Sequence, residues 1–310
     1  MFGFTFHYFE NEKHIPCQGS LTAEQFRRVL DALEREYRLI TPQEFLNHLK
    51  NGTGGENDIC LCFDCGLKSQ YDVALPVLEE RNLRAFWFLY TSVFQGGIVP
   101  IEQYHHFRFS CFPSISHFYR AFFAVLSQRD PERFVRGVEA FRTSGYLGWA
   151  GFYTEDDRKY KFFRDRVLET EEYDEILSEM MAAAHYDVEQ YRNLLWLNTG
   201  EVRYLSDSGH IIGMHTHTHP NEIGALSYEA QYAEYATNQR ILQEICGRPV
   251  TSMSHPCNSY NADTLRILET LGVEVGFRAD RNPSFSSRLE IPRLDHSQWI
   301  RMNKELKIWQ

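Results

Sequence analysis

The strongest constraint on the fold is an alternation of strand-like and helix-like segments that occupies both ends of the chain. Near the N-terminus, short apolar runs such as "DICLCFDCG" and "RAFWFLY" alternate with amphipathic segments such as "LTAEQFRRVLDALEREY". Runs this short and this uniformly apolar are typical of strands buried on both faces, whereas apolar residues at helical spacing indicate amphipathic helices. The alternation predicts an α/β fold built on a parallel sheet or barrel.

The alternation stops after about residue 92 and returns at about residue 206. Between these points, helical segments follow one another with few strand signals, and strand-like runs then return in "HIIGMHTHTHP", "VTSMSHP" and "VEVGFRA". We therefore expect residues 1–92 and 206–310 to form one domain and residues 93–205 to be a helical insertion. Because ligands bind beyond the C-terminal ends of parallel strands, we expect this insertion to cap that mouth.

Composition and charge favour a small-molecule partner. The net charge of −10 disfavours nucleic acid, because binding it requires Lys and Arg to neutralise phosphates. No run approaches ~20 apolar residues, and the stretch "MFGFTFHYFENEKH" lacks the features of a secretory signal, so we expect a cytoplasmic protein without membrane contact. The seven cysteines are an odd number, which argues against a disulfide framework and for reduced thiols. The sequence leaves open whether the protein forms a homo-oligomer.

The segment "HTHTHP" places three histidines at alternate positions after an apolar run. Neutral imidazole is a common metal ligand, so a metal site is the first hypothesis, and a solvated polar strand end is the alternative. Other polar groups also follow predicted strands, and we expect all of them to meet at one edge of the sheet. They are Asp64 and Cys65; His255, Pro256, Cys257 and Asn258; and Arg293, Asp295 and His296.

Two of these segments together resemble a known enzyme family. "CFDCG" resembles the TFDDG motif of the NodB-type polysaccharide deacetylases (carbohydrate esterase family 4), and "HTHTHP" is similar to their H-[ST]-x-x-H-P motif. The resemblance implies a distorted (β/α) barrel in which His215 and His219 hold a divalent metal and Asp64 is the general base. It also implies a general-acid histidine near the last strand, for which His296 is the nearest match.

The chain departs from the family pattern at two positions. Cys65 stands where the family has a metal-binding aspartate, and a thiolate with two imidazoles would form a Cys-His-His site biased toward Zn. The alternative is that Cys65 does not bind and the metal is weak, lost, or held by two histidines and water. Ser254 stands where the family has an arginine that orients the base; Arg293 could replace it, or could be an ordinary surface or sheet-edge arginine.

The resemblance implies a metal-dependent N-deacetylase. Asp64 would take the proton of a metal-activated water, and the tetrahedral oxyanion would be held by the metal and by a backbone N–H near Cys257. The neighbouring Pro256 and Asn258 are then candidate substrate-binding residues. Two rival functions share the scaffold: an amidohydrolase acting on a non-sugar amide, and a non-catalytic sugar-binding homologue with an altered metal site.

The expected cap argues for a small substrate. We predict a monomeric N-acetylated sugar, nucleotide-activated or of the nonulosonic-acid type, used in surface glycan biosynthesis. Within the insertion, "EQYHHFRF" gathers His105 and Arg108 among aromatic residues, which could receive a phosphate or carboxylate. A polar helix end is the alternative for this segment.

Overall fold

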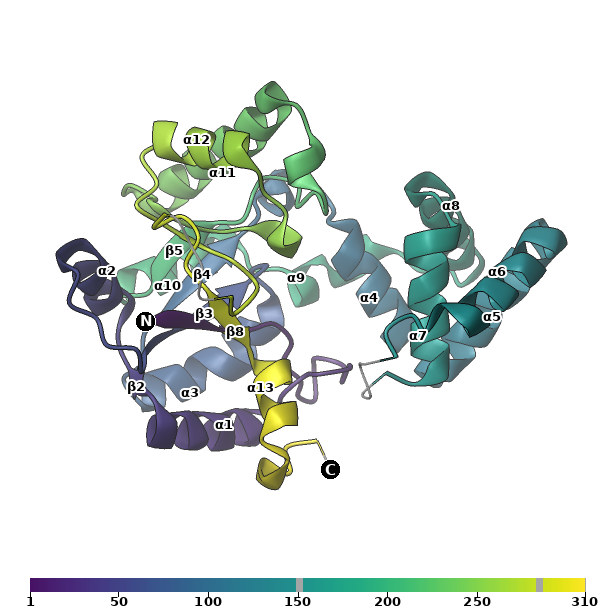
Figure 1. Cartoon of the computed structure of the whole chain (residues 1–310), viewed down its shortest axis with the longest axis horizontal. Helices are drawn as coiled ribbons and strands as arrows, with labels where there is room; N and C mark the ends of the chain where they lie inside the picture. The colour runs from purple at the N-terminus through teal and green to yellow at the C-terminus, as the bar shows by residue number, and fades with distance from the viewer. Residues whose placement is uncertain (149–152, 283–286, 310) are drawn as a thin grey trace. The chain divides into compact units, whose positions relative to one another are not determined.

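The computed structural model describes residues 1–148, 153–282 and 287–309. The chain divides into two compact units (Figure 1). The barrel unit comprises Met1–Val99 and Arg192–Gln310, and the helical unit comprises Pro100–Tyr191. The helical unit is therefore shorter than the insertion expected from the sequence, 93–205.

The barrel unit is built on a parallel sheet that nearly closes on itself. Its order is β7-β6-β5-β4-β3-β1-β8, and the short β2 pairs with β3. A parallel bridge between Phe277 and Ile291, with a hydrogen bond from Arg278 N to Ile291 O (2.8 Å), joins the two ends of the sheet. The expected distorted (β/α) barrel is thereby confirmed. The strands are β1 (Phe2–Phe6), β2 (Arg38–Leu39), β3 (Asp58–Asp64), β4 (Ala85–Leu89), β5 (Ile211–Met214), β6 (Ser252–Ser254), β7 (Val275–Phe277) and β8 (Arg293–Asp295).

Helices connect most of the strands and begin where the sequence supplies capping residues. In α2 (Pro42–Asn51), the Thr41 side chain accepts from Glu44 N and the Glu44 side chain accepts from Thr41 N, while Gly52 ends the helix in the left-handed conformation. The other barrel-unit helices are α1 (Ala23–Glu36), α3 (Leu75–Glu80), α9 (Arg192–Leu195), α10 (Thr199–Asp207), α11 (Tyr228–Cys246), α12 (Ala262–Thr270) and α13 (His296–Met302).

Alternation along β3 directs its side chains to two separate cores. Ile59, Leu61 and Phe63 belong to the large core that also includes helix residues, whereas Cys60 and Cys62 belong to a second core with residues of β4 and β7. Asp64 continues the Cys60–Cys62 series at the C-terminal end of the strand. The buried strand thus ends with a carboxylate at the mouth of the barrel.

The helical unit has an aromatic core of its own. Phe107, Phe118, Phe122 and Tyr160 are each at most 1% exposed and belong to the same cluster. Its α-helices are α4 (Pro100–Ser110), α5 (Ile115–Arg129), α6 (Pro131–Ser144), α7 (Glu155–Phe162) and α8 (Thr170–Ala183). In the described part of the chain, no helix is both long enough and apolar enough to span a membrane.

Candidate active site

The thiol of Cys65 and the imidazoles of His215 and His219 meet at the C-terminal ends of β3 and β5. Their potential ligand atoms lie within 4.8 Å of one another, and all three residues are buried. One thiolate and two imidazoles form a donor set that suits Zn and leaves a coordination position for water or substrate.

The turns that carry these residues have left-handed backbone conformations. The φ angles are 77° at Cys65, 64° at Thr216 and 60° at His219. Thr216 Oγ1 accepts a hydrogen bond from His219 N at 3.2 Å, which supports the second turn. Non-glycine residues in this region cost roughly 1–3 kcal/mol each, and such strain is concentrated at functional sites.

The two histidines are arranged as metal ligands require. His215 Nδ1 lies 2.9 Å from Ser254 O, so this nitrogen carries the proton and donates it, which leaves Nε2 with a lone pair. Nδ1 of His219 is buried and has no hydrogen-bond partner among the described residues. Burial lowers the pKa of His215 to about 3 and also lowers the pKa of His219, so both rings are neutral at pH 7. The residues present therefore fit a divalent cation.

Helix α11 braces the histidine motif through two residues one turn apart. Glu234 accepts hydrogen bonds from His217 N and Thr218 N, both at 2.8 Å, and Asn238 Oδ1 accepts from His215 N at 3.1 Å. Sequence reasoning did not identify either residue as part of the site. Their spacing of four on a predicted helix is the signal that could have identified them, because it places both side chains on one face.

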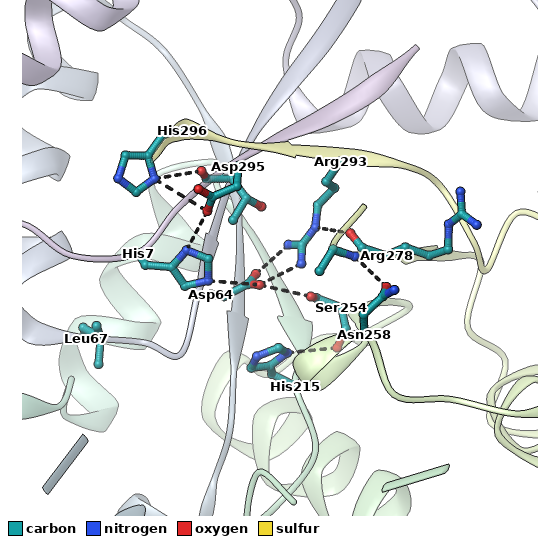
Figure 2. Close-up of polar contacts among 12 residues, drawn as sticks. His7, Asp64, Leu67, His215, Ser254, Asn258, Arg278, Arg293, Asp295 and His296 are labelled. Carbon is teal, nitrogen blue, oxygen red and sulfur yellow. Dashed lines mark hydrogen bonds and ion pairs between the residues drawn. The ribbon is translucent and has the colours of Figure 1, made fainter. Parts of the chain in front are cut away.

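Asp64 is buried and held by Arg293 through two hydrogen bonds (Figure 2). Nη1 lies 2.7 Å from Oδ1 and Nη2 lies 2.8 Å from Oδ2, and Ser254 Oγ donates to Oδ2 at 3.3 Å. Burial alone would raise the pKa of Asp64, but the charge of Arg293, with help from His215 and His7, lowers it well below its usual range. The carboxylate is therefore ionised, and its orientation is set by an arginine from β8.

His7, which sequence reasoning missed, lies between Asp64 and Asp295 (Figure 2). Its Nδ1 is 3.3 Å from Asp295 Oδ2, and its Nε2 is 3.9 Å from Asp64 Oδ2. Burial lowers the pKa of His7, but the hydrogen bond and charge of Asp295 and the charge of Asp64 outweigh burial and raise it. His7 directly follows β1 as Asp64 ends β3, so its place at a strand end was the available signal.

His296 lies beside Asp295 and His7: its Nδ1 is 3.8 Å from Asp295 Oδ2, and the potential ligand atoms of the three residues lie within 4.8 Å of one another. Nε2 of His296 lies 2.9 Å from Gly19 O and its Nδ1 lies 3.3 Å from Thr5 O, and the residue is 3% exposed. Both ring nitrogens therefore face backbone carbonyls. His7, rather than His296, presents a ring nitrogen toward Asp64.

The third motif forms a turn after β6. Pro256 is buried, and Cys257 and Asn258 have φ angles of 51° and 58°. Asn258 Nδ2 donates to Asp280 Oδ2 and Asn258 Oδ1 accepts from Ala279 N, both at 2.8 Å, so its side chain fastens the segment after β7. The exposed Cys257 has its Sγ 3.6 Å from Asn221 Oδ1. His105 and Arg108 lie on α4 of the helical unit.

Both chain segments that lead to the helical unit are hydrogen-bonded to the turns of the site. On the outgoing segment, Thr91 N and Ser92 N donate to His217 O at 3.1 and 2.9 Å. On the returning segment, Leu197 N donates to Gly66 O at 3.1 Å. Arg192 links the two segments, because its guanidinium donates to the carbonyl oxygens of residues 93, 96 and 97.

Comparison with known proteins supports the family that the motifs indicate. Residues 167–276 match the polysaccharide deacetylase family model. Similar solved structures include the deacetylase PplD from Streptococcus pyogenes in complex with acetate, at 13% identity with a TM-score of 0.58, covering 99% of this chain and 97% of that one. No curated protein sequence matches the chain.

Two further structures have the same fold. IcaB from Ammonifex degensii is 13% identical, with a TM-score of 0.57 and coverage of 99% of this chain and 96% of that chain. The BpsB deacetylase domain from Bordetella bronchiseptica is 11% identical, with a TM-score of 0.53 and coverage of 94% of each chain. The expected family resemblance is thus confirmed: residues 167–276 match the polysaccharide deacetylase family model, and the chain shares the fold of these three solved structures.

Proposed function

We propose that the protein is a metal-dependent N-deacetylase of a small N-acetylated sugar. The observation that carries this proposal is the convergence of the Cys65–His215–His219 cluster with a buried carboxylate, Asp64, that is aligned by Arg293. A bound divalent cation, with Zn favoured by the thiolate, would lower the pKa of its water and polarise the amide carbonyl.

The proton transfers are assigned to side chains of the chain itself. Asp64 accepts the proton of the attacking water, and its guanidinium partner holds the carboxylate in one orientation. His7 donates a proton to the departing amine from Nε2, because Asp295 faces Nδ1 and the raised pKa favours the protonated ring. His7 thus takes the general-acid role that the sequence suggested for His296. Acetate and a free amino group are the products.

The preference for a small substrate rests on the proposed cap. The helical unit inserts between β4 and β5, whose C-terminal ends flank the site. Long insertions beside a site are often active-site lids, and a lid favours a small substrate over a polymer. We therefore propose a monomeric N-acetylated sugar, nucleotide-activated or of the nonulosonic-acid type. The cytoplasmic location stays a prediction.

The proposal is tested by turnover and metal content measured together. The protein is incubated with a panel of N-acetylated sugars, nucleotide sugars and non-sugar acetamides, and released acetate is quantified. Asp64→Asn should abolish turnover without loss of metal or of folded structure. Deacetylation at the parent rate by this variant would remove Asp64 from the mechanism.

Cys65→Ala tests the ligand set against Cys111→Ala, which removes an exposed thiol in the helical unit. We expect Cys65→Ala to lose about one metal equivalent per chain together with turnover, and Cys111→Ala to keep both. Tight metal binding without turnover on any substrate, or sugar binding without metal, would instead favour the non-catalytic sugar-binding function. Turnover confined to non-sugar amides would favour the other amidohydrolase.

A further inference from the structure

A second group of potential metal ligands lies at the C-terminal ends of β1 and β8. His7 directly follows β1, Asp295 ends β8 and His296 begins α13, and Figure 2 shows the three side chains close together. One potential ligand atom from each residue lies within 4.8 Å of the other two. Ligand atoms that share one Zn²⁺ ion at about 2.0–2.2 Å lie roughly 3–4 Å apart, so a small movement of these side chains suffices to enclose an ion.

The carboxylate of Asp295 uses its two oxygens differently. Oδ1 caps α13 by accepting from Ser297 N at 2.8 Å and from Gln298 N at 3.3 Å. Oδ2 faces both imidazoles, at 3.3 Å from His7 Nδ1 and 3.8 Å from His296 Nδ1. Carboxylates that bind metals are themselves held by hydrogen bonds, and here the cap orients Oδ2 toward the two histidines.

His296 presents a lone pair to this group. Its Nε2 lies 2.9 Å from Gly19 O, the shorter of its two contacts with backbone carbonyls, and therefore carries the proton. Burial lowers the pKa of His296, so the ring is neutral at pH 7 and Nδ1 has no proton. Nδ1 nevertheless faces two oxygens, Thr5 O at 3.3 Å and Asp295 Oδ2 at 3.8 Å. A cation would turn this repulsive arrangement into an attractive one, and a backbone carbonyl on the other nitrogen is the usual partner of a metal-binding histidine.

The group is open to solvent on one side. The side chains of His7 and Asp295 are 33% and 23% exposed, whereas that of His296 is 4% exposed. An ion can therefore enter past His7 and Asp295, and water can complete its coordination. The group contains no thiolate, and an ion must displace the proton that joins His7 Nδ1 to Asp295. We therefore expect weaker binding here than at the Cys65–His215–His219 cluster.

We propose that His7 Nδ1, Asp295 Oδ2 and His296 Nδ1 form a second site for a divalent cation such as Zn²⁺, which fills when metal exceeds one equivalent per chain. The ion replaces the proton on His7 Nδ1, which is released to solvent, and the ring keeps its proton on Nε2. Donation of that last proton would leave an imidazolate on the ion, so the second ion inhibits turnover. The inhibition rests on the proposed function, whereas the site itself does not.

The site is tested by calorimetric titration of the whole chain, already holding one equivalent of metal, with Zn²⁺. We expect the parent to bind a second equivalent. His296→Gln should weaken binding of the second ion about tenfold or more and leave the first in place. Asp295→Asn, which keeps an oxygen for the cap of α13, should have the same effect. A parent that binds one equivalent only, or parent affinity for the second ion in both folded variants, would overturn the proposal.

Two control variants separate this site from other ligands. His117→Gln removes an exposed imidazole of α5 whose Nδ1 lies 2.8 Å from Ser114 Oγ, and it should keep the parent affinity for the second ion. An equal loss in His117→Gln would overturn the assignment. Cys65→Ala should lose the first equivalent and still bind Zn²⁺ at the second site; absence of all binding in this variant would contradict a separate site.

Turnover measured over the same range of Zn²⁺ concentration tests the inhibition. Activity of the parent should fall as the second site fills, and His296→Gln should need about tenfold more Zn²⁺ for the same fractional loss. Full activity with both equivalents bound would overturn the inhibitory role. Absence of turnover at every Zn²⁺ concentration would instead contradict the proposed function, and the calorimetric result would still decide whether the second site exists.

Discussion

Replacing Arg293 by methionine should destabilise the barrel because it leaves the Asp64 charge buried without its partner. Arg293 is 2% exposed and Asp64 is 3% exposed, and two hydrogen bonds of 2.7 and 2.8 Å join them. Removing one partner of a buried ion pair costs roughly 3–5 kcal/mol, whereas the intact pair contributes much less than that. We therefore expect Arg293→Met to lower the free energy of unfolding by about 3–5 kcal/mol at pH 7.

The pH dependence of this loss identifies its cause. In the parent protein the folded-state pKa of Asp64 is depressed, so its stabilising contribution is present above the unfolded pKa and is lost as pH falls through the folded pKa. Without Arg293, the loss of the attractive charge raises the pKa of buried Asp64. The difference between parent and variant should then be largest at neutral pH and shrink on acidification, as Asp64 of the variant takes up a proton.

The measurement is urea unfolding in the presence of a chelator, at pH 7 and at lower pH. Asp64→Asn in the Arg293→Met background should recover most of the lost stability, because no charge stays buried. Arg240→Met is the control, since this arginine is 56% exposed and pairs with Glu244 on the helix surface. A loss below about 1 kcal/mol, one independent of pH, or one that Asp64→Asn leaves unchanged would refute the reasoning.

Three further predictions concern the mechanism and the connections of the site. The protonated form of His7, which the proposed mechanism requires, is lost as pH rises through the raised pKa of His7, and Asp295→Asn removes the main cause of that raised pKa. The alkaline limb of kcat/KM should therefore move to lower pH in Asp295→Asn, and an unmoved limb would exclude the His7–Asp295 pair from the proton transfer. Gly3→Ala places a Cβ 2.8 Å from Cγ of Arg293, so kcat/KM should fall by roughly tenfold or more with metal content unchanged; parent activity would show that the guanidinium tolerates displacement. Chelation should increase proteolytic cleavage of residues 192–197, because Leu197 N donates to Gly66 O in the turn that carries the proposed ligand Cys65; equal cleavage with and without metal would contradict this coupling.

Much of the local structure could be predicted because it depends on neighbouring residues. Thr41, Glu44 and Gly52 define both ends of α2 through contacts within the same segment. The proposed metal ligands could be predicted for a related reason, since Cys65 directly follows β3, His215 directly follows β5, and parallel strands share one C-terminal edge. By contrast, the limits of the helical unit depend on packing. Val202 and Leu205 of α10 are buried in the barrel core, although their segment was expected in the insertion.

Which side chains surround Asp64 was decided by the tertiary structure. β8 pairs with β1 so that Thr5 lies opposite Asp295, and this register brings Asp295 within 3.3 Å of His7, whereas the ring nitrogens of His296 face backbone carbonyls. Asp295 ends β8 and His296 begins α13, so the two neighbouring side chains have different surroundings.

The sequence by itself determined the alternation of strands and helices, their caps and the residues available at each strand end, because all of these follow from local chemistry. Which arginine aligns Asp64, and which histidine faces it, was settled only when the barrel closed. Arg293 lies 229 positions from Asp64 along the chain, and only the pairing of β8 with β1 carries its guanidinium to that carboxylate.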